Sequence, residues 1–243
     1  MGQRLMCVVA HPDDECFAFG GALALAAQRG VETYVVCMTD GKAARNRGSA
    51  ASNEDLGRMR REEFAASCKV LGVAHYELLD YHDGDLINVP IIEAAGRLVE
   101  RFRSFRPDVV MTFGSDGGAN SHADHMMVAF WTTAAFHWSG QERRFPASGD
   151  AFRPKRLYYQ TTKYFIPDRQ PPQPMPWTVT LDVRSVEERK YEAFRQHVSQ
   201  APLLEQTWEY FAKYGAEEFY TLVAANDPQP AEQSTDLFDG LGG

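Results

Sequence analysis

The chain has 243 residues, of which 44% are hydrophobic, and it carries a formal net charge of −8. This size suffices for one sizeable core, so we expect one large α/β domain or one domain with an elaborated end. The negative charge argues against nucleic acid or an anionic membrane as a partner, because phosphate groups bind to basic surfaces.

The cysteines and the N-terminal residues indicate a reducing compartment. The cysteines are Cys7, Cys16, Cys37 and Cys68, and they form no C-x-x-C pair. We therefore predict buried thiols and no disulfide framework. The chain begins without the apolar segment of a signal peptide, and no apolar run approaches the roughly 20 residues that span a bilayer. The expectation is a soluble, cytoplasmic protein without a membrane segment.

The first part of the chain alternates between apolar runs typical of buried strands and segments with helical spacing. Strands are predicted at residues 5–10, 31–38, 76–79, 107–113 and 157–161. Helices are predicted at residues 17–29, 54–71 and 90–105, and another begins after Ser121, which can cap it. This alternation indicates right-handed βαβ units, and hence an α/β fold with a Rossmann-like, mostly parallel sheet and helices on both faces.

The region after about residue 140 changes character. Residues 163–176 contain too many prolines for a helix. The predicted elements that follow are a strand at 178–183, helices at 186–197 and 203–225, and a frayed polar tail at 226–243. We predict a single domain over residues 1–243, with a core at about 1–162 and a C-terminal elaboration at about 163–225.

The most informative stretch is His11-Pro12-Asp13-Asp14-Glu15, which directly follows the first predicted strand. Open α/β sheets bind ligands at the carboxyl ends of their strands. A turn with a helix cap would explain the proline and one aspartate. It would not explain a histidine with three acids after a buried strand, because like charges repel and a bound cation would relieve that repulsion.

A second cluster, His122-Ala123-Asp124-His125, follows the fourth predicted strand. A helix places residues three apart on one face, so both imidazoles can point the same way. Taken alone, Ser121 and Asp124 would form a capping box, with the histidines as polar surface. Both clusters follow parallel strands, however, so they emerge at one edge of the sheet. We predict that they meet around one metal ion.

Two histidines and a carboxylate suit zinc in a hydrolase or Fe(II) in an oxygenase, and the spare carboxylates favour hydrolysis. A zinc-bound water has a pKa of roughly 7, and an adjacent aspartate can take its proton. The spacing alone does not decide whether Asp13 or Asp14 binds the metal. Gly20-Gly21 lacks the G-x-G-x-x-G context, so a dinucleotide site is not supported.

These motifs resemble the LmbE-like or PIG-L family, which contains zinc-dependent N-acetylglucosaminyl deacetylases. The matching segments are His11 to Glu15 with Gly20-Gly21, Thr39-Asp-Gly41, Arg60-x-x-Glu63, Tyr81-His-Asp-Gly84, residues 122–125, and His197-Val-Ser-Gln200. The resemblance implies that His11, Asp14 and His125 bind the metal, which would be Zn²⁺, with Fe²⁺ as the alternative. It also implies that Asp13 is the general base acting on the metal-bound water.

The resemblance implies further roles around this centre. His122 would stabilise the tetrahedral intermediate or pass a proton to the amine, with Asp124 orienting it. Arg60 and Asp83 match positions that contact the sugar in related deacetylases. One departure is Ala123, which replaces the proline of the usual His-Pro-Asp-His motif, so we expect a looser turn there with the chemistry retained.

The predicted function is therefore a metal-dependent hydrolase that removes an acetyl group from the amide nitrogen of an N-acetylated amino sugar, of the N-acetylglucosamine type, or its conjugate. One alternative is an amidase for a larger thiol-sugar or natural-product conjugate, with loops 42–53 and 163–176 as walls or a lid. Another is a non-catalytic metal- or sugar-binding relative. The expected partner is a small amino-sugar molecule. The sequence leaves the oligomeric state open, a homo-oligomer included.

Overall fold

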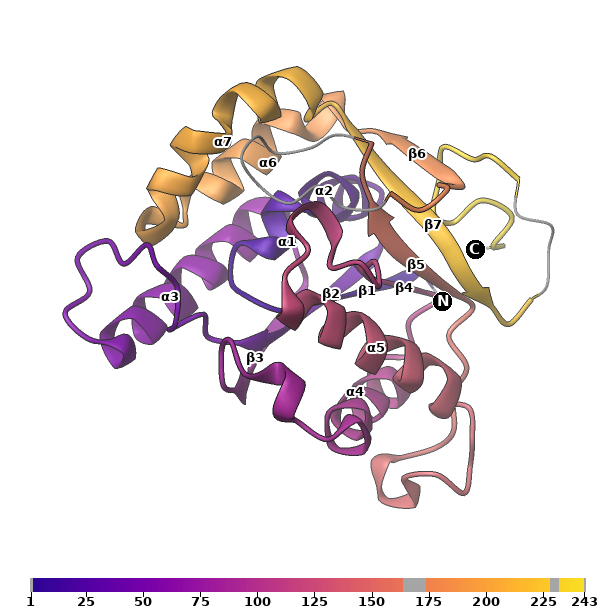
Figure 1. The fold of residues 1–243 in the computed structure, drawn as a ribbon. Coiled ribbons are helices and arrows are strands. Elements are labelled where there is room, and N and C mark those ends of the chain that lie inside the picture. Colours follow the sequence, from indigo (N-terminus) through magenta and orange to yellow (C-terminus); the bar gives the residue numbers. More distant parts are fainter. Residues whose placement is uncertain (1, 164–173, 228–231, 243) are drawn as a thin grey trace.

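A seven-stranded sheet with helices on both faces forms the centre of the structure (Figure 1). The structure, a computed structural model, describes residues 2–163, 174–227 and 232–242. The strand order is β3-β2-β1-β4-β5-β7-β6. The first five strands are β1 (Arg4–Val9), β2 (Glu32–Thr39), β3 (His75–Tyr81), β4 (Val109–Phe113) and β5 (Arg156–Thr161). They run parallel to one another, which confirms the predicted Rossmann-like, mostly parallel sheet.

Helices cover both faces of the sheet, as Figure 1 shows. One face carries α1 (Asp14–Phe17), α2 (Gly20–Gln28), α3 (Asn53–Leu71), α6 (Glu187–Arg195) and α7 (Ala201–Tyr214), and the other carries α4 (Ile91–Phe105) and α5 (Ala123–Trp138). The central strand β1 is buried on both sides, and Leu5 to Val9 have no exposed surface. This double cover explains why its sequence is continuously apolar and does not alternate.

Two predicted helices differ from the observed elements. The segment 17–29 is divided between α1 and α2, because the first turn of helix begins directly after Asp13. The segment 203–225 contains α7 and then β7 (Glu217–Ala225), which pairs antiparallel with β5 and with β6 (Val179–Asp182). The run from Phe219 to Val223 is rich in aromatic and β-branched residues, which favour a strand.

The described part of the C-terminal tail packs against the sheet, so the expectation of fraying does not describe residues 232–242. Ser234 exchanges backbone hydrogen bonds with Thr178 and Thr180. Leu237 and Phe238 are buried, with 3% and 5% of their surface exposed. These contacts support our proposal of one domain over residues 1–243, in which the C-terminal elaboration completes the sheet.

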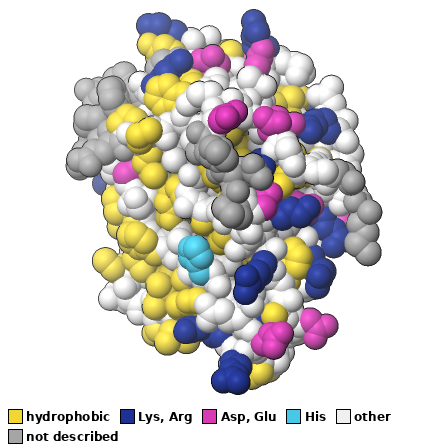
Figure 2. All heavy atoms as spheres, turned by 90° about the vertical axis from the view of Figure 1, so that its right-hand side faces the viewer, with side chains coloured by type: hydrophobic (Ala, Val, Ile, Leu, Met, Phe, Trp, Pro, Cys, Tyr) yellow, Lys and Arg dark blue, Asp and Glu magenta, His cyan; other side chains and the backbone are white. Residues whose placement is uncertain are grey.

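The burial of the cysteines and the mixture of side chains on the described surface agree with what the composition predicts. The four cysteines are free and buried, as predicted. On the face shown in Figure 2, basic and acidic side chains of the described residues are interspersed with hydrophobic ones. Among the helices of the described ranges, none combines the length and the apolar character that crossing a membrane requires. Most of the proline-rich loop predicted at 163–176 lies outside the described residues.

Candidate metal centre and active site

The structure brings the two predicted clusters together at the carboxyl edge of the sheet. His11 follows β1, Asp83 follows β3, and Asp124 lies in the first turn of α5. His11 Nε2 is 3.1 Å from Asp83 Oδ1 and 3.2 Å from Asp124 Oδ2. The ring of His122 lies 4.8 Å from that of His11 and 5.1 Å from that of His125. Residues from three separate parts of the chain therefore share one polar site.

Asp14 presents a separate oxygen to each of two imidazoles, at distances close to that between two ligands of one metal. His125 Nε2 lies 3.3 Å from Asp14 Oδ1, and His11 Nδ1 lies 3.5 Å from Asp14 Oδ2. Two ligands bound tetrahedrally to zinc at roughly 2.0–2.1 Å are about 3.3–3.4 Å apart. The donor set of two imidazoles and one carboxylate also suits a divalent cation such as zinc or iron.

The remaining nitrogen of each imidazole has a hydrogen-bond partner of the kind that metal-binding histidines use. His11 Nε2 faces the carboxylates of Asp83 and Asp124, and His125 Nδ1 donates to the Gly117 carbonyl at 3.0 Å. Such contacts fix the tautomer and the direction of the ring. They leave His11 Nδ1 and His125 Nε2 directed at Asp14. Donor atoms of His11, His122 and His125 also lie within 4.8 Å of one another, as an overlapping set.

Gly117 allows the loop before α5 to pass close to the beginning of that helix. Its φ of 86° favours glycine, and a Cβ there would lie 2.8 Å from the His122 backbone nitrogen. The loop can therefore approach α5 closely enough for the Gly117 carbonyl to reach His125.

Burial and neighbouring charges shift the ionisation of the site. Burial favours the neutral form of Asp14, but His125 and His11 outweigh it and hold its pKa well below the ordinary value. Burial likewise opposes a charge on His11, but its hydrogen bonds with Asp124, Asp14 and Asp83 raise its pKa well above the ordinary value. Burial raises the pKa of Asp13 to about 6, although Arg60 acts in the opposite direction. The acidic groups around His11 thus favour positive charge at this position.

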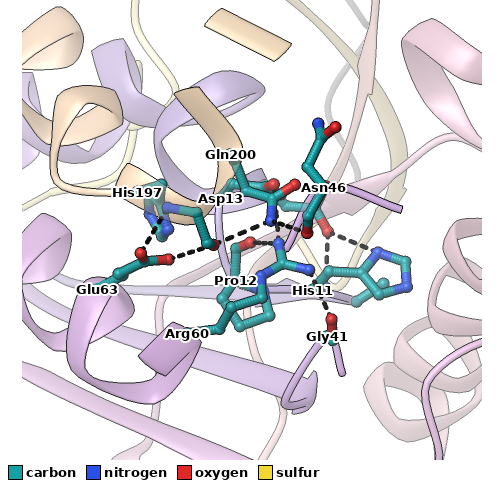
Figure 3. Close-up of polar contacts among 12 residues, drawn as sticks. His11, Pro12, Asp13, Gly41, Asn46, Arg60, Glu63, His197 and Gln200 are labelled. Atoms are coloured by element: carbon teal, nitrogen blue, oxygen red, sulfur yellow. Dashed lines mark hydrogen bonds and ion pairs between the residues drawn. The ribbon is translucent and has the colours of Figure 1, made fainter. Parts of the chain in front are cut away.

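Arg60 holds Asp13 from the side of α3 (Figure 3). Its guanidinium donates to Asp13 Oδ2 at 2.8 Å, to the Gly41 carbonyl at 2.9 Å and to the Pro12 carbonyl. Only 3% of Arg60 is exposed. Its burial and contacts point to a role in fixing Asp13, and a direct contact between Arg60 and the sugar stays a prediction.

Asp83 is likewise held in place by contacts within the protein. It is buried, it contacts His11, and its Oδ2 accepts the backbone N–H of Ala43 at 2.7 Å. The loop predicted at 42–53 is thereby attached to the site at Ala43. A contact between Asp83 and the sugar also stays a prediction.

His122, and not Ser121, caps α5. Its Nδ1 accepts the backbone N–H of Asp124 at 3.1 Å, whereas Ser121 has a φ of 51° and lies outside the helix. A neutral His122 therefore carries its proton on Nε2. Burial, His11 and His125 all lower the pKa of His122, which favours that neutral form.

The carboxylate of Asp124 points to His11, and its predicted role in orienting His122 stays a prediction. It contacts His11 Nε2 and accepts backbone N–H groups of Gly84 at 2.8 Å and Leu86 at 3.3 Å. The physical reason is the direction of the first turn of α5, which points this carboxylate across to the loop after β3. The backbone N–H of Asp124 is the group that contacts His122.

Replacing Asp124 by asparagine is expected to weaken metal affinity by about 10–100-fold, because an amide is a poorer acceptor for the second nitrogen of His11. Competition with a metal-chelating dye would measure this. Asp80→Asn, at an exposed carboxylate paired with Arg97, is the control and should leave the affinity unchanged. Equal affinity in both variants would contradict the role given to Asp124.

A second buried polar cluster behind Asp13 was not anticipated. Glu15 Oε1 lies 2.8 Å from His197 Nε2 and also accepts a hydrogen bond from Ser67. The resemblance at residues 197–200 was the sole sequence signal for this cluster, and it gave no role to the histidine.

Comparison with known proteins decides the family. The family model PIG-L: GlcNAc-PI de-N-acetylase matches residues 6–136, more than half of the chain. The chain belongs to the PIG-L family. This result confirms the resemblance inferred from the motifs.

The names of individual relatives describe related activities. A mycothiol S-conjugate amidase of Streptomyces coelicolor is 34% identical over 177 residues, a match that spans 64% of this chain and 60% of the amidase. A 1D-myo-inositol 2-acetamido-2-deoxy-alpha-D-glucopyranoside deacetylase of Rhodococcus jostii is 29% identical, with 99% of each chain covered.

Among solved structures, the N,N'-diacetylchitobiose deacetylase of Pyrococcus horikoshii has a TM-score of 0.75 and is 23% identical. The match covers 91% of this chain and 84% of that chain. At this identity the likeness shows a shared fold.

Proposed function

We propose that this PIG-L protein is a metal-dependent hydrolase that removes the acetyl group from an N-acetylated amino sugar or its conjugate. The observation that carries this proposal is the arrangement of His11 and His125 around Asp14, with Asp13 next to it in the chain. Each imidazole presents one nitrogen to Asp14 and binds a second partner with the other. The centre thus combines a metal-ligand set with an adjacent carboxylate that is not needed as a ligand.

His11, Asp14 and His125 would hold the metal. A metal bound there supplies Lewis acidity, which polarises the amide carbonyl and makes a water molecule easier to deprotonate. The ligand residues are all buried, with 7%, 8% and 5% of their surface exposed. Their burial strengthens electrostatic interactions in the site because little water is present to screen them.

Asp13 takes the proton from the attacking water. Arg60 fixes the direction of the Asp13 carboxylate. Asp13 is adjacent to Asp14 in the chain and therefore lies beside the proposed metal ligand. The oxygen of the water forms a bond to the acetyl carbon as the proton passes to Asp13. Breakage of the carbon–nitrogen bond then releases acetate and the amine, and the amine nitrogen receives a proton.

His122 assists the same step from the other side of the site. Because its Nδ1 accepts a backbone N–H, its Nε2 can donate to the developing oxyanion or to the leaving nitrogen. His122 is exposed, in contrast to His11 and His125, so a substrate can reach it. Asp124 supports this site indirectly, through His11.

Removal of the metal tests the proposal. Purified protein should release acetate from N-acetylglucosamine conjugates, lose that activity on prolonged dialysis against a chelator, and regain it with Zn²⁺ or Fe²⁺. Elemental analysis of the untreated protein would identify which metal it carries. Full activity in metal-free protein would contradict the proposal, and bound metal without hydrolysis of any amide would favour a non-catalytic relative.

The match to a mycothiol S-conjugate amidase favours a second candidate with the same chemistry, an amidase for a bulkier thiol-sugar conjugate. The deacetylase from Rhodococcus jostii, which is matched over its whole length, favours the acetyl substrate. A panel that pairs small N-acetyl sugars with S-conjugated thiol sugars separates the two. A higher kcat/KM for the S-conjugates would select the amidase.

A further inference from the structure

The backbone of Asp13 has an unusual conformation that the surrounding residues must enforce. Its φ is 115° and its ψ is −25°, which lie in the left-handed region that side chains other than glycine rarely adopt. Such a conformation persists where neighbouring contacts determine it. Asp13 O accepts hydrogen bonds from Phe17 N at 2.9 Å and from Cys16 Sγ at 3.0 Å, which fix one side of the residue.

Glu15 fixes the other side. Its Oε2 accepts the backbone N–H of Asp13 at 2.9 Å, and the whole residue has no exposed surface. An ionised carboxylate is a stronger acceptor than a neutral one, but a buried charge needs partners. Ser67 and His197 both donate to Glu15 Oε1, the histidine at 2.8 Å. These two donors stabilise the Glu15 carboxylate in the position in which it accepts the Asp13 N–H.

His197 comes from a distant part of the chain, 182 positions from Glu15. Only 1% of its surface is exposed. Its Nδ1 has no hydrogen-bond partner among the residues that the structure describes, so Nε2 makes the sole hydrogen bond found there for the ring. Among the described residues the ring is thus hydrogen-bonded to Glu15 alone, with the Cys16 thiol within 4.8 Å as a further polar neighbour.

The segment that begins at His197 also holds the helix on which Arg60 lies (Figure 3). In the 3-10 turn Val198–Gln200, the Ser199 backbone N–H and Oγ both donate to Glu63 of α3 at 2.7 Å. Gln200 Nε2 donates to the Asn46 carbonyl at 3.1 Å, which ties down the loop after β2. One C-terminal segment therefore supports Asp13 from two directions.

We propose that His197 is a positioning residue for Asp13. Through Glu15 it holds the Asp13 peptide in its left-handed conformation, and the Asp13 carboxylate then points toward Arg60 and the metal ligands. Its consequence for turnover rests on the proposed function. The conformational claim does not, and it can be tested separately.

Crystal structures of His197→Leu and His197→Gln test the conformation directly. Leucine removes the donor to Glu15, whereas glutamine keeps a side-chain N–H at a similar distance from the backbone. In His197→Leu we expect Asp13 to lose its hydrogen bond to Glu15 and to leave positive φ, and in His197→Gln we expect both to persist. An unchanged Asp13 in His197→Leu would overturn the proposal, whether or not the wild-type protein hydrolyses any amide.

Steady-state kinetics tests the consequence. His197→Leu should lower kcat by about 10²-fold, the usual scale for a misplaced catalytic group, with KM and metal content unchanged. His197→Gln should recover most of that loss, and His197→Leu should cost little more in an Asp13→Asn background, because both changes act through one carboxylate. A merely structural histidine would lower the melting temperature and leave kcat per folded molecule unchanged, or would cost the same in both backgrounds.

Ser67→Ala provides a milder variant if His197→Leu does not fold. It removes the other donor to Glu15 Oε1 and leaves the histidine in place. We expect a smaller loss of kcat in the same direction, again reduced in the Asp13→Asn background. An equal loss in the two backgrounds would overturn the role of this cluster. Absence of acetate release by the wild-type protein would instead reject the proposed function, and the crystal structures would then decide the positioning role.

Discussion

Replacing Asp13 by asparagine is expected to lower kcat by about 10²–10⁴-fold, the usual contribution of a general base. Asparagine keeps the shape of the side chain and an oxygen that can accept from Arg60, but it cannot take a proton from water. Asp13→Ala should give a loss of the same order. Because neither change removes a proposed ligand, elemental analysis should show the metal content of the wild-type protein in both variants.

Asp14→Asn is the matched comparison, because the two residues are adjacent and receive the same substitution. Asp14 contacts both His11 and His125, so this variant should lose metal and activity together. Retained metal in Asp14→Asn with lost metal in Asp13→Asn would mean that the two roles are reversed. Normal kcat in Asp13→Asn would reject the proposed mechanism.

Lys190→Met is expected to cause a large loss of stability. Lys190 Nζ lies 2.7 Å from Glu218 Oε1, and the side chains are only 5% and 4% exposed. Glu218 also accepts the backbone N–H groups of Gly21 and Ala22, and thereby satisfies the beginning of α2. Breaking a buried ion pair by removing one partner costs about 3–5 kcal/mol, because the other charge is left uncompensated.

Methionine is a suitable replacement because it retains the stem that packs against Gly20, where an added Cβ would lie 2.9 Å from Lys190 Cγ. Since about 1 kcal/mol shifts the melting temperature of a domain of this size by about 2–4 °C, the lower estimate predicts a fall of about 6–12 °C. Lys69→Met, at an exposed position of α3, is the control and should change stability by less than about 0.5 kcal/mol. Similar melting temperatures for the two variants would show that the pair with Glu218 contributes little.

The parallel part of the sheet could be predicted from the sequence because burial on both faces of a sheet determines which residue types its strands contain. A strand covered on each side by helices is apolar at every position, as in Leu5 to Val9, and such runs separated by helical spacing specify βαβ units. The same reasoning failed at residues 217–225. That segment forms a strand because β5 and β6 pair with it, and the local signals were the C-cap Gly215 of α7 and the aromatic and β-branched residues that follow it.

The location of the site was predictable for a related reason. Parallel strands deliver their carboxyl ends to one edge, so His11 and His125 had to emerge near one another once both were assigned to positions after strands. The partner of each polar group was not predictable in this way. The carboxylate of Asp124 contacts His11, 113 positions away, and only the backbone N–H of Asp124 contacts His122, because the direction of the first turn of α5 decides where the carboxylate points.

The sequence by itself determined the parallel part of the sheet, the edge at which the chemistry lies and the residue types that gather there, because periodicity and spacing are local properties of the chain. The tertiary structure alone decided that Arg60 fixes Asp13, that Glu218 caps α2, and that His197 reaches Glu15 across 182 positions. These are contacts between side chains on separate elements. Their existence depends on how the helices pack on the sheet, to within the length of a hydrogen bond, and no local pattern records distances of that kind.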